Sequence, residues 1–321
     1  MTLFQLFARI SAGAGLCLLT TLAVAQNTAP VRLLVGYAAG GPVDAAARVF
    51  APALAKELGV QVLVENRPGA GGAVAGEQVA KAAIDSNLLF FAASPTVTIS
   101  PHIQKKMGFD PAKDLTPLAP LLTYANVLVV SAESPIKSLA DMVAQAKANP
   151  GRLSYGSAGM GASNHLSGEL MEHFIGAKLL HVPYKGNAPA MTDVIGGQIT
   201  MMFDIVGTAR NFISAGRVRA LAVTSRERNR SLPDVPTLRE AGVPDYEVVG
   251  WFAVYGPARM DPAQARRLSN AMNKVMAQEE LRAQFATQGY DIWTGSPQAL
   301  AAQQKSDFDM WAKVTKGITI D

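Results

Sequence analysis

Short apolar runs alternate with helical segments along most of this chain, and this alternation constrains the fold more than any other feature. The runs expected to form strands are residues 31–35, 62–64, 88–92, 127–130, 153–155, 179–181, 201–203, 221–223 and 248–254. The segments expected to form helices are residues 45–58, 72–82, 139–148, 164–175, 188–195, 262–278 and 297–316. Such a pattern is typical of right-handed βαβ units. It predicts an α/β protein with parallel strands, helices on both faces, and ligands beyond the carboxyl ends of the strands.

A glycine-rich stretch follows the strand expected at residues 153–155. Residues 156–161 read GSAGMG, and a helix is expected to begin near Ser163, with Ser163 or Asn164 as its N-cap. Glycines leave main-chain N–H groups free to point into the gap before the helix, where the helix dipole adds positive potential. The stretch predicts an anion-binding loop; a strand-to-helix turn without a ligand is the alternative.

A second stretch of the same kind lies early in the chain. Residues 36–44 read GYAAGGPVD and lead into an alanine-rich helix at residues 45–58. The two stretches begin at Gly36 and Gly156, which are 120 residues apart (156 − 36). Two loops of this kind suggest two lobes that hold one ligand between them.

The first 25 residues differ from the rest of the chain. They contain one basic residue (Arg9), an apolar run over residues 10–24, and Ala-Val-Ala at residues 23–25 as a cleavage site before Gln26. This is the pattern of a signal peptide. A membrane anchor is the alternative, but the run is short and ends in a cleavage pattern rather than in a basic cluster. We therefore expect an exported protein.

Cysteine content and charge exclude several classes of partner. The single cysteine, Cys17, lies in the predicted signal peptide after Leu16, which is not the small residue that lipidation requires, so the mature chain would have no disulfide or thiol site. Loss of Arg9 takes the formal charge from +4 to +3 (4 − 1), with no run of basic residues. Nucleic acid is therefore not expected as a partner.

A glycine run at residues 65–76 is not a dinucleotide fingerprint. After Gly69 and Gly71, Val74 stands where the third glycine is needed, and the run follows the second strand rather than the first. The segment is expected to be a backbone turn with Arg67 as a local tether. No cofactor is predicted.

Five further residues follow expected strands, and each has more than one interpretation. Ser94 and Thr96 lie in a hydroxyl-rich turn and either donate to an anion or are ordinary loop residues. Tyr184 can stack on or hydrogen-bond a ligand, and the neighbouring Lys185 is either a surface charge or a ligand contact. Asp204 either caps the next helix, orders water, or meets a cationic ligand group.

A hydrolase is the enzymatic alternative, with Ser157 or Ser163 as nucleophile and His165 as base. Ser163 and His165 are two residues apart at a helix start, so their side chains should diverge, and no Gly-x-Ser-x-Gly motif is present. His165 and His173 are eight apart, further than a helical metal site favours. No catalytic residue and no metal site are predicted.

Seven segments, in order along the sequence, carry a likeness that spans essentially the whole mature chain. They are residues 35–48 (VGYAAGGPVDAAAR), 64–72 (VENRPGAGG), 155–169 (YGSAGMGASNHLSGE), 182–190 (VPYKGNAPA), 196–204 (GGQITMMFD), 220–225 (ALAVTS) and 232–242 (LPDVPTLREAG). Together they closely resemble the tripartite tricarboxylate transporter substrate-binding proteins, the TctC or Bug family of periplasmic receptors.

The resemblance implies a two-lobed periplasmic binding protein of the Venus-flytrap, type II-like class. Each lobe would be a mostly parallel sheet flanked by helices, with two crossovers between lobes. Lobe 1 would comprise residues 26–126 and 250–321, and lobe 2 residues 127–249. The protein would be a monomeric receptor, not an enzyme, and would deliver a small organic carboxylate to large and small membrane transporter subunits. A sensor that presents its closed form to a signalling partner is the alternative.

The resemblance also implies the ligand contacts. One set of donors would be Tyr37, Ala39, Gly40, Gly41 and Asp44; the other would be Ser157, Ala158, Gly159, Gly161, Ser163, Asn164 and His165. Ser94, Thr96, Tyr184 and Asp204 would line the cleft. The family usually has a proline where this chain has Gly36, which should leave the strand end beside the ligand loop less rigid. A second departure, at residues 84–87, should affect only a surface turn.

Overall fold

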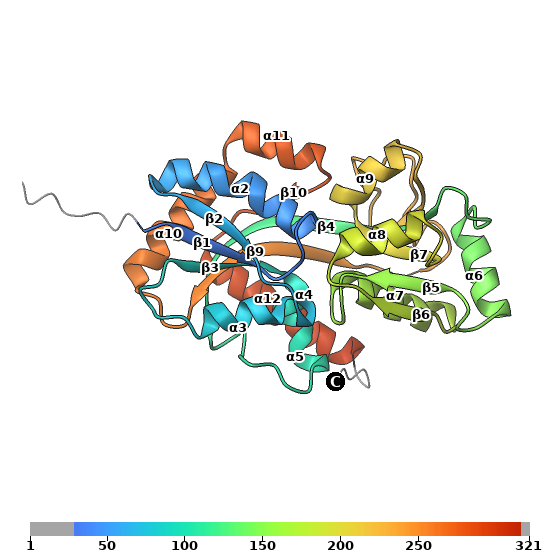
Figure 1. Cartoon of the computed structure of the whole chain (residues 1–321), viewed down its shortest axis with the longest axis horizontal. Coiled ribbons are helices and arrows are strands. Elements are labelled where there is room, and N and C mark those ends of the chain that lie inside the picture. Colours follow the sequence, from blue (N-terminus) through green and yellow to red (C-terminus); the bar gives the residue numbers. More distant parts are fainter. Residues whose placement is uncertain (1–28, 245, 316–321) are drawn as a thin grey trace, which may run out of the picture.

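The computed structural model describes residues 29–244 and 246–315, arranged as two halves side by side along the long axis (Figure 1). The predicted signal peptide lies outside the described residues. Within the described ranges, no helix combines the length and the apolar character needed to cross a bilayer.

The strands form a sheet in the order β2-β1-β3-β9-β4-β7-β5-β6, with β8 and β10 also paired to β4. The strands are β1 (Val31–Val35), β2 (Val62–Asn66), β3 (Leu88–Ala93), β4 (Leu115–Ser131), β5 (Ser154–Ser157), β6 (Leu180–Pro183), β7 (Met201–Ile205), β8 (Val218–Val223), β9 (Val249–Pro257) and β10 (Asp291–Ile292). The helices are α2 (Pro42–Leu58), the 3-10 turn η1 (Ala70–Gly72), α3 (Ala73–Ala80), α4 (Ser94–Thr98), α5 (Ser100–Ile103), α6 (Leu139–Ala148), α7 (Ser163–Ile175), α8 (Asn187–Ile195), α9 (Val206–Ser214), α10 (Pro262–Met276), α11 (Glu279–Thr287) and α12 (Pro297–Val314).

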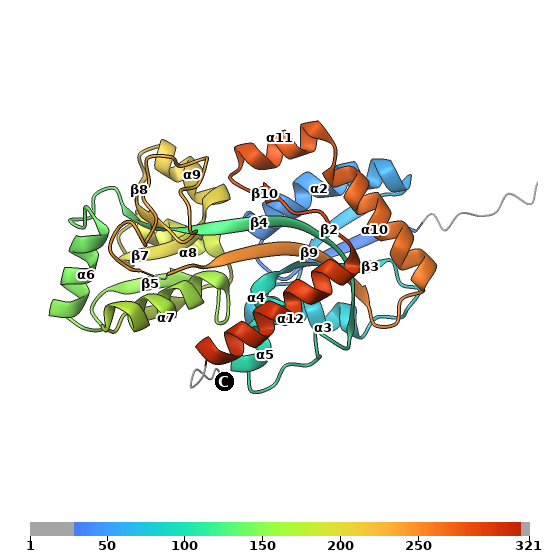
Figure 2. The ribbon, with the colours of Figure 1, turned by 180° about the vertical axis from the view of Figure 1, so that it is seen from behind.

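Strand β4 joins the two halves. Its residues 115–125 pair with β9, while residues 126–131 pair with β7 and β8. We call β1–β3, β9, β10 and residues 115–125, with helices α2–α5 and α10–α12, the first half. We call β5–β8 and residues 126–131, with helices α6–α9, the second half. The chain returns to the first half at the start of β9, and α12 lies behind this central region (Figure 2).

The predicted α/β class is confirmed, but the sheet is mixed rather than mostly parallel. Strands β1–β3 pair in parallel with one another, as do β5–β7, whereas every pairing made by β4 or β9 is antiparallel. The antiparallel pairs are made by the two strands at which the chain passes from one half to the other. β4 has a partner on each side in both halves: β9 and β10 in the first, and β7 and β8 in the second.

Several elements differ from the sequence expectations. The first part of β4 was not expected, because Pro117 and Pro120 cannot donate to a ladder; the register with β9 shifts next to both prolines. Ser94 and Thr96 lie in helix α4 rather than in a turn, with Pro95 in its first turn. The predicted N-cap of α7 is wrong, because Ala162 occupies that position without a side-chain cap.

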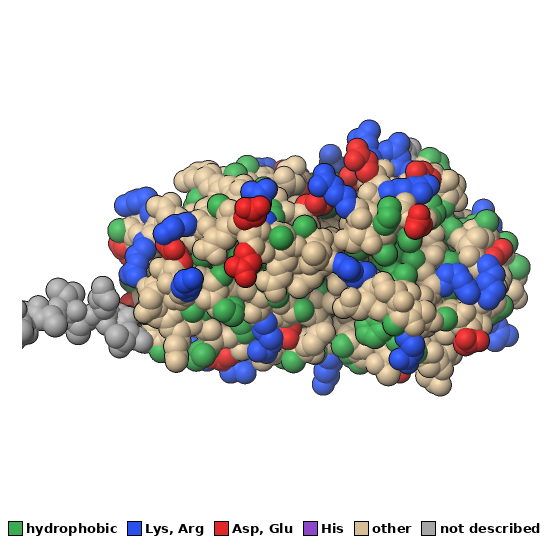
Figure 3. Space-filling view, turned by 90° about the horizontal axis from the view of Figure 1, so that it is seen from above, with side chains coloured by type: hydrophobic (Ala, Val, Ile, Leu, Met, Phe, Trp, Pro, Cys, Tyr) green, Lys and Arg blue, Asp and Glu red, His purple; other side chains and the backbone are tan. Residues whose placement is uncertain are grey.

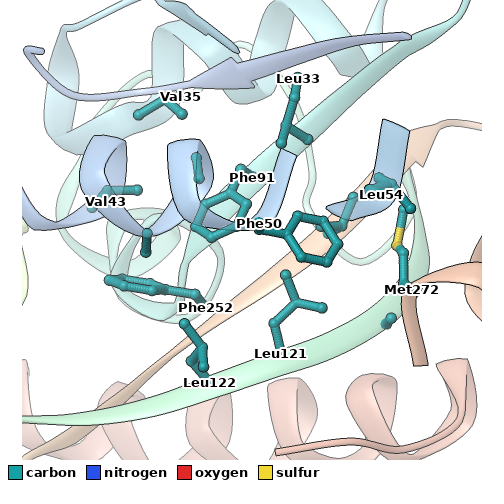
Figure 4. Packing of buried hydrophobic residues seen from close by; sticks show 14 of the residues in the cluster. Leu33, Val35, Val43, Phe50, Leu54, Phe91, Leu121, Leu122, Phe252 and Met272 are labelled. Atoms are coloured by element: carbon teal, nitrogen blue, oxygen red, sulfur yellow. The ribbon is translucent and has the colours of Figure 1, made fainter. Parts of the chain in front are cut away.

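Helix α2 packs on the first half through aromatic and aliphatic side chains (Figure 4). Phe50 of α2 lies 6.3 Å from the ring of Phe91 on β3, which lies 5.7 Å from Phe252 on β9. All three side chains are fully buried. Each buried ring stabilises the fold by roughly 1.5–3 kcal/mol, so this cluster fixes α2 and the loop before it.

Candidate functional site

A pocket of about 560 Å³ lies where the two halves meet. We call it the interhalf pocket. The first half lines it with Gly36, Gly69–Gly72 and Gln104–Lys106, and the second half with Ala158–Met160, Tyr184 and Lys185. The structure thus brings Ala158, Gly159 and Tyr184 to this pocket, whereas the other predicted site residues do not line it.

The two halves are in contact beside this pocket. The N–H of Ala38 donates to the carbonyl of Lys185 across the boundary, at 3.2 Å. A Cβ on Gly71 would lie only 2.6 Å from the carbonyl oxygen of Met160, so the absence of a side chain allows the halves to approach. We call this arrangement, in which the two halves touch beside the pocket, closed.

Asp44 organises the first glycine loop. Its carboxylate accepts from the N–H of Gly40 (2.9 Å), the guanidinium of Arg48 (3.0 Å) and the amide of Asn66 (2.9 Å). Burial alone would raise the pKa of Asp44, but these hydrogen bonds outweigh it and lower the pKa. The Gly40 N–H, expected to face a ligand, is directed at this carboxylate. Ala39 and Gly40 lie exposed at the loop tip, and Gly41 is the N-cap of α2.

Tyr37 and Thr96 hold the glycine run that forms η1. Their hydroxyls both donate to the carbonyl of Gly71, at 2.8 and 2.7 Å. Burial raises the pKa of Tyr37 to about 12, so its hydroxyl keeps its proton. Ser94 accepts a hydrogen bond from the N–H of Trp251 on β9.

Gly36 also supports this run. A Cβ at that position would lie 2.5 Å from the Cα of Gly72 and 2.8 Å from its carbonyl oxygen. The expectation of a looser strand end therefore gives way to a close backbone contact, which only glycine permits.

Side chains of the second glycine loop and of the start of α7 accept hydrogen bonds from the N–H groups of the loop. Asn164 accepts from Ala158 N–H (3.0 Å), and Nδ1 of His165 accepts from Gly161 N–H (3.1 Å). Gly159 N–H donates to Oγ of Ser157 at 3.2 Å. Ser163 is buried in the first turn of α7, where its carbonyl accepts from Ser167. The loop thus reaches its shape through its own polar side chains.

Ser157 is paired with a histidine that the sequence did not single out. Its Oγ lies 2.6 Å from Nε2 of His181, whose ring lies 4.2 Å from that of His165. Burial, with the nearby His165, lowers the pKa of His181 to about 3. Ser157 is fully buried, so the pair lies behind the loop and supports it.

Asp204 and Tyr184 also have partners within the protein. Asp204 accepts from the Asn187 amide, and at 2.8 Å each from the N–H of Ile205 and the hydroxyl of Thr208. It does not cap α9, because Ile205 is the N-cap of that helix and no side chain caps it. Burial raises the pKa of Asp204 to about 6 although these hydrogen bonds oppose the shift. The Tyr184 hydroxyl donates to Asp193 at 2.6 Å, and the residue borders the pocket.

The glycine run at residues 69–72, Lys105 and Lys106 were not among the predicted ligand contacts, and Lys185 was predicted to be either a surface charge or a ligand contact. The run was visible in the sequence, but its spacing was judged only against nucleotide binding. Among the described residues, no group of three or more His, Cys, Asp or Glu side chains is placed to hold a metal ion. Acidic and basic side chains are interspersed on the face shown in Figure 3.

Known proteins resemble this chain over nearly its full length. The model of the tripartite tricarboxylate transporter family receptor matches residues 46–320. A UPF0065 protein from a Pseudomonas species is 35% identical over 95% of this chain and 93% of its own length. Protein BugT of Bordetella pertussis is 31% identical over 89% of this chain and 88% of its own.

Solved structures agree in fold. The periplasmic binding protein BugD superposes with a TM-score of 0.86 at 31% identity, covering 90% of this chain and 97% of BugD. MatC from Rhodopseudomonas palustris with bound malate gives 0.85 at 29% identity, covering 89% and 98%. Another R. palustris protein, with adipate, gives 0.86 at 31% identity, covering 91% and 98%. The chain therefore belongs to the tripartite tricarboxylate transporter receptors, the TctC or Bug family of periplasmic substrate-binding proteins, and is a binding protein rather than an enzyme.

Proposed function

We propose that this protein captures a small organic carboxylate, of the di-, tri- or aromatic class, between its two halves. The observation that carries the proposal is the interhalf pocket, to which the second glycine loop and the 69–72 run both contribute main-chain groups. A carboxylate removed from water needs several N–H or O–H donors, because an unpaired buried charge is costly. The malate and adipate in the two related structures support the choice of carboxylates.

The predicted contact residues enter this proposal as two groups. Ala158, Gly159 and Tyr184 border the pocket, whereas Asp44, Asn164 and His165 hold the two glycine loops in shape by accepting from loop N–H groups. We propose that the remaining predicted residues contribute by shaping the same loops and the starts of the adjoining helices. The two lobes are proposed to be residues 26–126 with 250–321 and residues 127–249.

We further propose that the loaded protein delivers its ligand to large and small membrane subunits of a tripartite transporter. The membership of the chain in a receptor family supports this step. Export to the periplasm through the signal peptide at residues 1–25, and action as a monomer, belong to the same proposal.

Calorimetric titration tests the proposal directly. The purified protein is partly unfolded, dialysed to remove any bound molecule, refolded, and titrated with mono-, di-, tri- and aromatic carboxylates. At a hundredfold excess over Kd, a ligand should also stabilise the fold by roughly 2.7 kcal/mol. Binding of no carboxylate by a refolded protein would contradict the proposal.

Loop variants extend this test to the site. Asp44→Ala and Ser157→Ala should each weaken carboxylate binding, because each removes the acceptor for an N–H of a glycine loop. Asp234→Ala, at an exposed carboxylate outside both loops, is the matched control. Unchanged affinity in both loop variants would rule out a role for the two loops.

A further inference from the structure

The charged side chains that line the interhalf pocket are all of one sign. They are Lys105 and Lys106, after α5 of the first half, and Lys185, before α8 of the second half. Among the described lining residues there is no aspartate or glutamate. A ligand with an ammonium group would therefore meet like charge here and no carboxylate.

Two of these lysines have unused ammonium groups. Within the described part of the chain, no hydrogen bond or ion pair is formed by the ammonium group of Lys106 or Lys185. The other long polar side chains of the lining are already engaged. Gln104 donates to the carbonyl of Ala70 at 2.9 Å, and Tyr184 donates to Asp193. The lysines are thus the side-chain donors left to a ligand.

The remaining lining of the pocket is small and largely apolar. Gly36, Ala70, Ala158 and Met160 present backbone and short or apolar side chains. These walls offer few polar side-chain atoms, so they suit a ligand with a hydrocarbon middle.

Closure brings the two lysines to one pocket from opposite halves. The carbonyl of Lys185 already accepts from Ala38 across the boundary, so this residue lies at the contact itself. Without an anion between them, two ammonium groups in one pocket repel each other and oppose closure. A carboxylate placed between them removes this repulsion and joins the halves.

We propose that Lys106 and Lys185 bind the distal carboxylate of an α,ω-dicarboxylate and thereby make closure selective for dianions over monocarboxylates and amino acids. The inference rests on the proposed function, since the proximal carboxylate would be held by the glycine loops. It assigns the ligand class within that function, and it assigns the selectivity to two residues on opposite sides of the cleft.

Matched ligands test the selectivity. The refolded, ligand-free protein is titrated with succinate, glutarate and adipate, and with the monocarboxylate and the ω-amino acid of each chain length. We expect the best dicarboxylate to bind at least about tenfold more tightly than its monocarboxylate partner, and the ω-amino acid to bind most weakly. The preference should shrink as salt is added, because the lysines are solvent-exposed.

Lysine variants test whether Lys106 and Lys185 cause the selectivity for dicarboxylates. Lys106→Met and Lys185→Met should each weaken dicarboxylate binding about tenfold and leave monocarboxylate binding unchanged. Lys147→Met, an exposed lysine of α6 away from the pocket, is the control and should change neither. Circular dichroism of each variant verifies the fold.

Different experimental results would overturn each of the two proposals. If monocarboxylates and dicarboxylates bind equally well, or if both lysine variants keep wild-type affinity for dicarboxylates, the lysine assignment is overturned and the carboxylate receptor stands. Tighter binding of an ω-amino acid overturns the assignment in the same way. If no carboxylate binds, both proposals are overturned.

Discussion

Single side chains of the two glycine loops shape the main chain around the site. Asp44, Asn164 and His165 each accept an N–H from a loop residue, so the loops are ordered from within. Glycine contributes differently, because at Gly36 and Gly71 the next segment lies where a Cβ would stand. Polar acceptors and missing side chains together fix the main-chain surface that the two halves present.

Gly36→Ala should destabilise the fold by about 1–3 kcal/mol, since its methyl group would overlap the backbone of Gly72. Gly196→Ala is the control, because its φ is −77° and its new methyl group would make only ordinary contacts. Urea denaturation of both variants measures the difference. Equal stability of the two variants would show that β1 and the glycine run can move apart without cost.

Asp204 should make stability depend on pH. Because burial raises its folded-state pKa from 3.8 to about 6, the protonated acid stabilises the fold, and that contribution is lost as the pH rises through about 6. Asp204→Asn removes the dependence, so the stability of the variant relative to wild type should rise by about 3 kcal/mol between pH 4 and pH 7. Urea denaturation at both pH values measures it, with exposed Asp234→Asn as control. A pH-independent difference would contradict the assignment.

At the scale of elements, local sequence determines some boundaries and tertiary contacts determine others. Strand β1 and helix α6 begin and end where the pattern predicts, because each carries its own periodicity and, in α6, a capping box. Strand β4 begins twelve residues before the expected position 127 (127 − 115), because pairing with β9 tolerates Pro117 and Pro120.

The site shows the same division. The glycine loops are visible in the sequence because glycine is rare enough in runs to be informative. The contact of Ser157 with His181 spans 24 residues, and Lys106 and Lys185 meet one pocket only through the arrangement of the two halves. No local sequence pattern predicts either pairing. The sequence therefore predicted the glycine loops, but neither the Ser157–His181 contact nor the meeting of Lys106 and Lys185 at one pocket.

Helix α6 should depend on its capping box. Ser138 accepts from the N–H of Asp141, whose carboxylate accepts from the N–H of Ser138. Ser138→Ala should therefore destabilise the protein by about 1 kcal/mol. Ser214→Ala, at the exposed last residue of α9, is the matched control. Thermal denaturation checks both, and an unchanged midpoint for Ser138→Ala would show that packing alone defines the start of α6.

At the scale of the whole molecule, the closed arrangement depends on how near the halves can come. Gly71→Ala should weaken carboxylate binding and leave the ligand-bound protein less compact, because its methyl group would meet the Met160 carbonyl. Gly197→Ala is the control. Gly197 has a similar left-handed backbone, with φ of 71° against 60° at Gly71, but no atom lies near its new methyl group. Titration and small-angle scattering of both variants separate steric obstruction from strain. Equal compaction and affinity would contradict the role of Gly71.

The shared strand has a consequence for the order in which the protein can fold as it is made. Residues 126–248 supply all the strands of the second half from one continuous stretch, which is finished while the last part of the chain is still being synthesised. Trp311 of α12 joins the core of that half later. The first half needs β9 and α10–α12, so its early strands must wait for the end of the chain. A ribosome-bound chain that ends before β9 should thus contain a structured middle and an unfinished beginning.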